Sequence, residues 1–106
     1  MKISSDDVKK VVDGNLAVLN YVKNEKFSFV CAEINGAQSS SGDNTDDSLY
    51  FFLEGIVYVR IGENGFECHK NDLVIIPKKT KFELAGKGKC IIITSPLICS
   101  GNEERV

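Results

Sequence analysis

Alternating apolar and polar residues, the pattern typical of β-strands, cover most of this chain after residue 15. In the sequence FSFVCAEI (27–34), Phe27, Phe29, Cys31 and Glu33 share one face of a predicted strand. Ser28, Val30, Ala32 and Ile34 share the other face, and Asn35-Gly36 is expected to end the strand. A similar stretch begins at Leu16, and four more span residues 49–55, 56–65, 66–72 and 73–98.

Turn signals separate these stretches, and the last three of them follow one another at intervals of roughly 8–10 residues, which is typical of an all-β sandwich or barrel. They are Asn24-Glu25-Lys26, Glu54-Gly55, Glu63-Asn64-Gly65 and Lys70-Asn71-Asp72. Asn64-Gly65 is the strongest hairpin signal. Pro77 has no N–H to donate, so it predicts a strand end or an edge.

Two segments depart from the strand pattern. Residues 4–14 have a serine cap and two aspartates, followed by Val8, Val11 and Val12 on one helical face and then Gly14, so they predict a short helix. Residues 37–47 are small, polar and acidic, and we expect a loop at a barrel mouth. The domain prediction is a single unit: an N-terminal helix (1–15), a barrel (16–98) and a flexible tail (99–106).

The composition excludes several classes of protein. A chain of 106 residues with 42% hydrophobic and 26% charged residues has room for one globular core. Its net charge of -2 favours neither nucleic acid nor an anionic membrane. No apolar run resembles a membrane span or a signal peptide, so we expect a cytoplasmic protein. The cysteines Cys31, Cys68, Cys90 and Cys99 form no zinc-type spacing, so we expect reduced thiols rather than a disulfide or a reactive thiol.

The stretch from Gly36 to Gly86 resembles the two sequence motifs of the cupin superfamily. Gly36 and Gly55 match the glycines that bound the first motif, and its two histidine places and one glutamate place hold Gly42, Asn44 and Ser48. In the second motif, Pro77 matches, whereas the two glycine places hold Asn71 and Lys79. The histidine and asparagine places of that motif hold Phe82 and Gly86.

This resemblance implies an all-β antiparallel jelly-roll barrel, to which the pattern of residues 4–14 adds one short N-terminal helix. It also implies a homodimer, because many small cupins pair through edge strands. The resemblance further implies loss of the metal site and no cofactor, because Gly42, Asn44, Ser48 and Phe82 offer none of the usual first-row metal ligands. The loop aspartates Asp43, Asp46 and Asp47 are an alternative source of ligands.

Strand alternation predicts the lining of the barrel mouth. If Ser48 faces inward, then Tyr50 and Phe52 follow it, and Thr80 and Leu84 share the inward face of Phe82. The predicted ligand-binding residues are Asn44, Ser48, Tyr50, Thr80 and Phe82, with Glu33 and Tyr58 as additions. The same residues also suit a closed core in which Tyr50 and Phe82 fill the former metal site. We expect His69, the only histidine, to be an exposed hairpin residue that anchors no catalytic triad.

Three functions stay open from the sequence. The first is a metal-free protein that binds a small molecule, sugar-like or anionic, in the barrel mouth, with the lysine cluster Lys78, Lys79, Lys81, Lys87 and Lys89 attracting an anion. The second is a metal-independent isomerase, epimerase or nucleoside-processing enzyme, with Tyr50, Glu33, Tyr58 or a loop aspartate as acid–base groups. The third is a dimerisation module with a filled barrel. Partners other than a small molecule and a second copy are not expected.

Overall fold

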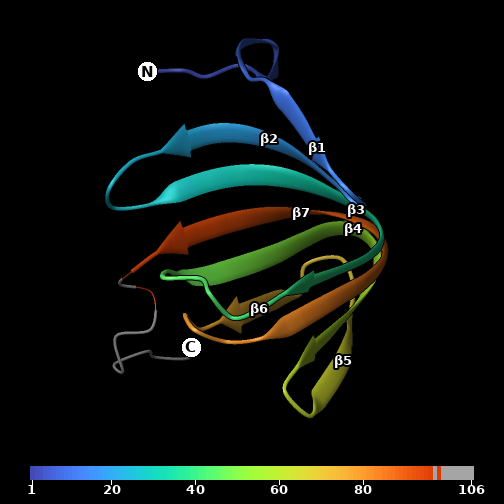
Figure 1. The fold of residues 1–106 in the computed structure, drawn as a ribbon. Helices are drawn as coiled ribbons and strands as arrows, with labels where there is room; N and C mark the ends of the chain where they lie inside the picture. Colours follow the sequence, from blue (N-terminus) through green and yellow to red (C-terminus); the bar gives the residue numbers. More distant parts are fainter. Residues whose placement is uncertain (97, 99–106) are drawn as a thin grey trace.

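A computed structural model describes residues 1–96 and 98, and most of these residues are in β-strands. The elements are a 3₁₀ turn η1 (Ser5–Asp7) and strands β1 (Lys10–Asp13), β2 (Leu16–Lys23), β3 (Ser28–Ser40), β4 (Asp47–Ile61), β5 (Asn64–Cys68), β6 (Leu73–Ile76) and β7 (Phe82–Ser95). The strands form one antiparallel sheet in the order β1-β2-β3-β7-β4-β5, with β6 also paired to β4. Figure 1 shows this sheet rolled over on itself, which confirms the predicted jelly roll. No helix in the described residues has the length and apolar character needed to cross a bilayer.

The three long strands each contribute to both layers of the roll. The first half of β4 pairs with β6 and its second half pairs with β5, while β7 stays beside it along the whole length. The first half of β3 also pairs with β2. In Figure 1 the strands bend on one side and their ends gather on the opposite, open side. The inward faces of the two layers therefore enclose a single core.

Glycines allow the backbones to approach closely at this bend. Gly36 pairs with Gly86, and Gly55 pairs with Gly88 on the neighbouring strands. Gly55 has a φ of 84°, and a Cβ placed there would lie 2.2 Å from the Lys87 carbonyl oxygen. At Gly86, with a φ of 134°, the Ile56 carbonyl oxygen would be 2.4 Å away. No residue with a side chain fits these positions unless the backbone moves.

A β-bulge in β4 changes which side chains face the core. Before the bulge, even-numbered residues point inward, and Phe52 is fully buried. The register shifts between Phe52 and Glu54, so that after it the odd-numbered Val57 and Val59 are fully buried. Tyr58 is therefore exposed, and its predicted inward direction was wrong. Glu33 is also exposed, because its side chain points to the other face of β3 from its buried neighbours Ala32 and Ile34. Its predicted inward direction was therefore wrong too.

The predicted N-terminal helix is reduced to the three residues of η1. Ser4 caps this turn and accepts a hydrogen bond from the Asp6 N–H, as expected for a serine cap. The predicted helical face of Val8, Val11 and Val12 was wrong, because residues 10–13 form β1 instead. β-branched valines favour strands, and Gly14-Asn15 forms a two-residue turn that pairs β1 with β2.

Several predicted boundaries also moved. β3 does not end at Gly36 but continues to Ser40, because residues 37–40 pair with β7, so the loop spans only residues 41–46. Glu54-Gly55 is part of the bend rather than a turn. The hairpin near Asn64 turns at Gly62-Glu63, whereas the turn at residues 70–71 and the strand end before Pro77 are confirmed. The predicted flexible tail (99–106) and Cys99 lie outside the described residues.

Two non-glycine residues have a left-handed backbone, and both lie where the cupin motif has glycine. Asn71 has a φ of 73° and Lys79 a φ of 58°. Asparagine tolerates this conformation, whereas a lysine there carries a conformational cost of about 1–2 kcal/mol. The chain has therefore kept the backbone path of the second motif after losing its glycines.

The bend predicts a large difference between two glycine-to-alanine substitutions. Gly55→Ala should lower the free energy of unfolding by about 3 kcal/mol, because the new Cβ strikes backbone atoms and the φ is strained. Gly62→Ala has a similar positive φ of 59° but nothing within 4 Å of its Cβ, so it should cost only about 1 kcal/mol. Urea unfolding of both variants measures the difference, and equal losses would contradict the role given to the bend.

The strained lysine predicts a stabilising glycine. Lys79→Gly should raise the free energy of unfolding by about 0.5–1 kcal/mol, because the relief at positive φ exceeds the entropy that glycine adds to the unfolded chain. The matched control is Lys81→Gly, two residues along the chain, where φ is not positive and a loss of about 0.5–1 kcal/mol is expected. Thermal melts would argue against this interpretation if both variants lost stability equally.

Candidate functional site

A polar pocket of about 350 Å³ lies at the open end of the barrel. We call it the mouth pocket. Its polar side chains come from β2, β3, β4, β7, the turn after β2 and the loop 41–46: Asn20, Lys23, Asn24, Ser28, Asn44, Thr45, Asp46, Ser48 and Thr94. Phe27 and Val30 supply apolar wall. Its volume is within the range of small-molecule sites, about 300–1,000 Å³.

Strand register brings the central hydroxyls of the mouth pocket together. Ser28 on β3 pairs with Thr94 on β7, and Thr94 pairs with Ser48 on β4. The Ser28 and Thr94 hydroxyls are hydrogen-bonded to each other. The Ser48 hydroxyl makes no hydrogen bond to any residue that the structure describes. Three adjacent strands thus present a row of hydroxyls to the pocket, one of them available to a ligand.

The loop 41–46 is held against the turn that follows β6. The Lys79 backbone N–H donates to the Asn44 carbonyl oxygen at 2.9 Å, and the Asn44 amide donates to the Pro77 carbonyl at 3.4 Å. At the start of β4, the buried Asp47 carboxylate accepts a hydrogen bond of 2.8 Å from the Lys78 N–H. This wall of the mouth pocket is therefore fixed by the two motif regions together.

The Asn44 side chain has one polar atom without a partner. Its amide nitrogen donates to the carbonyls of Asp46 and Pro77, but its Oδ1 atom is buried and accepts no hydrogen bond from the described residues. An unsatisfied buried acceptor costs about 1–3 kcal/mol, and Asn44 is one of the residues that line the mouth pocket.

Below the mouth pocket the barrel is packed. Tyr50 is buried, and its ring meets the half-buried Phe82 edge to face, with centroids 6.0 Å apart. Burial raises the pKa of Tyr50 above its ordinary value, and the neighbouring Cys90 adds to the shift, so this phenol stays neutral. Burial and the proximity of Cys31 raise the pKa of Cys90 to about 12. The interior is therefore closed at Phe82 and open at Ser48.

The predicted ligand-binding residues fall into three places. Asn44 and Ser48 line the mouth pocket, and Tyr50 and Phe82 form the aromatic pair beneath it. Thr80 lies in the turn before β7 and donates its hydroxyl to the Lys78 carbonyl, outside the mouth pocket. The predicted inward direction of Ser48, Tyr50 and Phe52 is confirmed by their burial.

The residues at the places of the cupin metal ligands are poor donors for a metal ion. Gly42, Asn44, Ser48 and Phe82 offer at most an amide and a hydroxyl, which bind first-row metals weakly. The loop aspartates do not converge in their place: Asp43 accepts from the Ser41 hydroxyl, and Asp47 is bonded to the Lys78 N–H. Across residues 1–96 and 98, no group of three or more His, Cys, Asp or Glu side chains is arranged to hold a metal.

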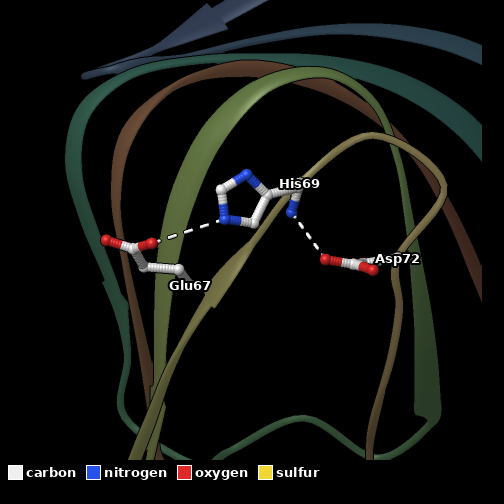
Figure 2. Close-up of polar contacts among 3 residues, drawn as sticks. All are labelled: Glu67, His69 and Asp72. Atoms are coloured by element: carbon white, nitrogen blue, oxygen red, sulfur yellow. Dashed lines mark hydrogen bonds and ion pairs between the residues drawn. The ribbon is translucent and has the colours of Figure 1, made fainter.

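His69 lies after β5, away from the mouth pocket. Figure 2 shows its ring beside Glu67, with Nε2 at 3.3 Å from the carboxylate, while its backbone N–H donates to Asp72. The His69 side chain is 54% exposed, which confirms the predicted hairpin histidine. The contact with Asp72 closes the β5–β6 turn, and neither contact brings a nucleophile to the ring.

The lysine cluster divides between the two ends of the barrel. Lys78, Lys79 and Lys81 are exposed near the mouth, whereas Lys89 pairs with Glu33 and Glu54 at the bend. Cys31, Cys68 and Cys90 are free thiols, as predicted. Burial raises the pKa of Cys31, and burial together with Asp72 raises the pKa of Cys68 to about 11, so these thiols stay protonated near neutral pH.

Six polar residues of the mouth pocket were not among the predicted site residues: Asn20, Lys23, Asn24, Ser28, Thr45 and Thr94. Ser28 and Thr94 are single hydroxyls beside apolar strand residues, which is a weak signal alone. Their significance depends on the pairing of β3 with β7, which are more than sixty residues apart in the chain. Lys23 faces inward because the register of β2 shifts between Asn20 and Val22.

Solved structures with the same fold come from several organisms. One is PAC13 of Streptomyces with uridine, with a TM-score of 0.81, 13% identity and coverage of 91% of this chain and 81% of that chain. Another description of Pac13 calls it a nucleoside dehydratase. An RmlC-like cupin from Shewanella frigidimarina has a TM-score of 0.78, 13% identity and 93% coverage of both chains. KdgF from Halomonas has a TM-score of 0.73, 13% identity and coverage of 86% of this chain and 90% of that chain. At these identities the likeness shows the fold alone.

The sequence itself also matches a protein family. No curated protein matches the chain, but the family model "Mannose-6-phosphate isomerase, cupin domain" matches residues 17–95. This match spans β2 to β7 and includes both degenerate motifs and the mouth pocket. The chain is therefore a cupin and belongs to the family of the mannose-6-phosphate isomerase cupin domain.

Proposed function

We propose that this cupin binds a small, neutral, hydroxyl-rich molecule, such as a nucleoside or a sugar, in the mouth pocket without a metal. The observation that carries the proposal is the inward row of Ser28, Thr94 and Ser48 in a pocket that Asn44 also lines. Amides and hydroxyls both donate and accept, so they suit ligand hydroxyls, whereas the closed apolar core offers such a ligand nothing. PAC13, which shares the fold, is described with uridine.

The charges of the mouth pocket favour a neutral ligand over an anionic one. Among the lining residues, Lys23 is the only cation and Asp46 the only anion, so their formal charges cancel. Lys78, Lys79 and Lys81 lie on the nearby turn but do not line the pocket. At the rim, the exposed ring of Phe27 gives a planar base or the apolar face of a sugar a surface for packing.

A metal-independent enzyme acting in the same pocket is a second candidate. Tyr50 follows Ser48 on the inward face, and its hydroxyl makes no hydrogen bond to the described residues. Its raised pKa keeps it neutral, so it is a hydrogen-bond donor rather than a base. Relatives by fold include a nucleoside dehydratase and the polyketide cyclase RemF from Streptomyces resistomycificus. Tyr50 does not line the mouth pocket, so binding is the primary proposal.

The binding proposal predicts stabilisation by a neutral nucleoside. Uridine at saturating concentration should raise the melting temperature, because a ligand that binds only the folded state at about 100 times its Kd adds about 2.7 kcal/mol. Ser48→Ala should weaken uridine binding roughly 5–10-fold in calorimetric titration, since one hydrogen bond is lost. Ribose and ribose 5-phosphate are tested in the same way. Their comparison with uridine distinguishes recognition of the sugar, of the base and of an anion.

The matched control is Ser39→Ala. Ser39 is an exposed serine on the same strand as Ser28, but it points away from the mouth pocket. This variant should bind uridine as the wild type does. The proposal fails if no neutral sugar or nucleoside stabilises the protein, or if Ser39→Ala weakens binding as much as Ser48→Ala does. The enzyme candidate is tested by chromatography of uridine after incubation with the wild type or with Tyr50→Phe. The candidate requires that the wild type forms a product and that Tyr50→Phe does not.

Metal independence is a separate prediction. Elemental analysis of the purified protein should find zinc, manganese, iron and nickel well below one equivalent per chain, because Gly42, Asn44, Ser48 and Phe82 are poor ligands. Excess EDTA should leave the uridine-induced shift in melting temperature unchanged. One equivalent of a transition metal, or loss of the shift in EDTA, would contradict the prediction.

A further inference from the structure

The hairpin that joins β2 to β3 forms one wall of the mouth pocket. It lies at the open side of the barrel (Figure 1), where Lys23 pairs with Ser28 and the Asn24 N–H donates to the Phe27 carbonyl oxygen at 2.9 Å. Lys23, Asn24 and Phe27 all line the pocket and are exposed, so a ligand in the pocket can contact each of them.

The side-chain amide of Asn24 has a fixed orientation. Its Oδ1 atom accepts hydrogen bonds from two backbone N–H groups of the turn, that of Lys26 at 2.8 Å and that of Phe27 at 3.0 Å. The flipped amide would point its own N–H₂ group at these two donors, so the turn excludes it. Nδ2 is therefore the polar atom of Asn24 that remains for a ligand, and it makes no hydrogen bond to the residues that the structure describes.

The side chains around Asn24 combine hydrogen-bond donors with an aromatic surface. Lys23 carries an ammonium group, which donates and cannot accept. The ring of Phe27 is 42% exposed, and a planar base can pack on it. The Asn24 amide lies beside this ring, because its oxygen is bonded to the Phe27 N–H. A base packed on Phe27 therefore has a donor of fixed direction at its edge.

We propose that Asn24 selects the base of a bound nucleoside, with its Nδ2 donating to a carbonyl oxygen of a base that packs on Phe27. The pocket then favours an oxo pyrimidine such as uracil over an amino pyrimidine such as cytosine. This inference rests on the proposed function, in which the same pocket binds a neutral nucleoside or sugar, and it commits the ligand to a nucleoside.

The fixed amide is what makes the two bases distinguishable. Both bases have a carbonyl group at position 2 of the ring. At position 4, uracil has a carbonyl oxygen, which accepts, where cytosine has an amino group, which donates. An amide that turns freely can present its oxygen or its nitrogen and so pairs with either base. The two N–H groups that hold Asn24 Oδ1 remove this freedom and leave only the donor.

Calorimetric titration with uridine and with cytidine tests the proposal. The wild type should bind uridine about 10-fold more tightly, because the fixed donor gains one hydrogen bond with uracil and opposes the amino group of cytosine. Asn24→Asp keeps an oxygen for the Lys26 and Phe27 N–H groups but replaces Nδ2 with a second acceptor. This variant should lower the preference for uridine about 10-fold or more. Its melting temperature without ligand should match that of the wild type, because the turn keeps both hydrogen bonds.

The matched control is Asn20→Asp, which brings the same charge into the same pocket. The Asn20 amide makes no hydrogen bond to the described residues, so no contact fixes its direction. Both nucleosides are neutral near pH 7, so an added charge by itself affects them alike. Asn20→Asp should therefore leave the ratio of the two affinities near the wild-type value.

The outcomes separate the role of Asn24 from the proposed function. The role of Asn24 is overturned if the wild type does not prefer uridine, if Asn24→Asp keeps the wild-type ratio, or if Asn20→Asp changes the ratio as much. Ribose that binds as tightly as uridine also overturns it, because the base then contributes nothing. In each of these cases, binding that Ser48→Ala weakens still supports the proposed function. If no sugar or nucleoside binds the wild type, the proposed function and this inference fail together.

Discussion

The close approach of backbones at the glycine bend is the constraint on which the rest of the structure depends. Gly55, Gly86 and Gly88 bring β4 and β7 within contact of each other's carbonyl groups while both strands change direction. Because of this bend, one continuous sheet can present two inward faces to each other and bury residues such as Phe52 and Val59 from both halves. The strand ends at the open side of the barrel lie opposite the bend (Figure 1), and residues from these ends line the mouth pocket.

The register of the paired strands also determines which residues line the mouth pocket. In the inward row that lies one step nearer the bend than the pocket hydroxyls, the strands contribute Val30, Ile92 and Tyr50, and the interior is closed. At the last row before the open end they contribute Ser28, Thr94 and Ser48, and the interior is polar. Imidazole and carboxylate ligands would project from the same region in a metal-binding cupin. Here the ring of Phe82 packs against Tyr50, and the polar groups of the open end are hydroxyls and amides, which suit hydrogen bonding.

Much of the fold could be predicted from the sequence, because glycine and proline spacings report backbone shape directly. The positive φ angles of Asn71 and Lys79 show that the second motif keeps its path even where its glycines are replaced. The errors came from features that change register. Periodicity alone placed Tyr58 inward, but the bulge at Leu53 reversed the faces of the second half of β4. The helix expected near Val11 failed because pairing with β2 outweighed a local capping signal.

The site was only partly predictable for a related physical reason. Asn44 and Ser48 could be found because they occupy motif positions, whereas Ser28 and Thr94 become neighbours only through long-range pairing.

A crystal structure of the protein grown with saturating uridine, with anomalous scattering recorded, tests the central claim most directly. The account predicts nucleoside density in the mouth pocket in contact with Ser48 and Asn44, an unchanged Tyr50–Phe82 pair, and no anomalous peak inside the barrel. Ligand density beneath a displaced Phe82, or a transition metal at the centre of the barrel, would contradict it.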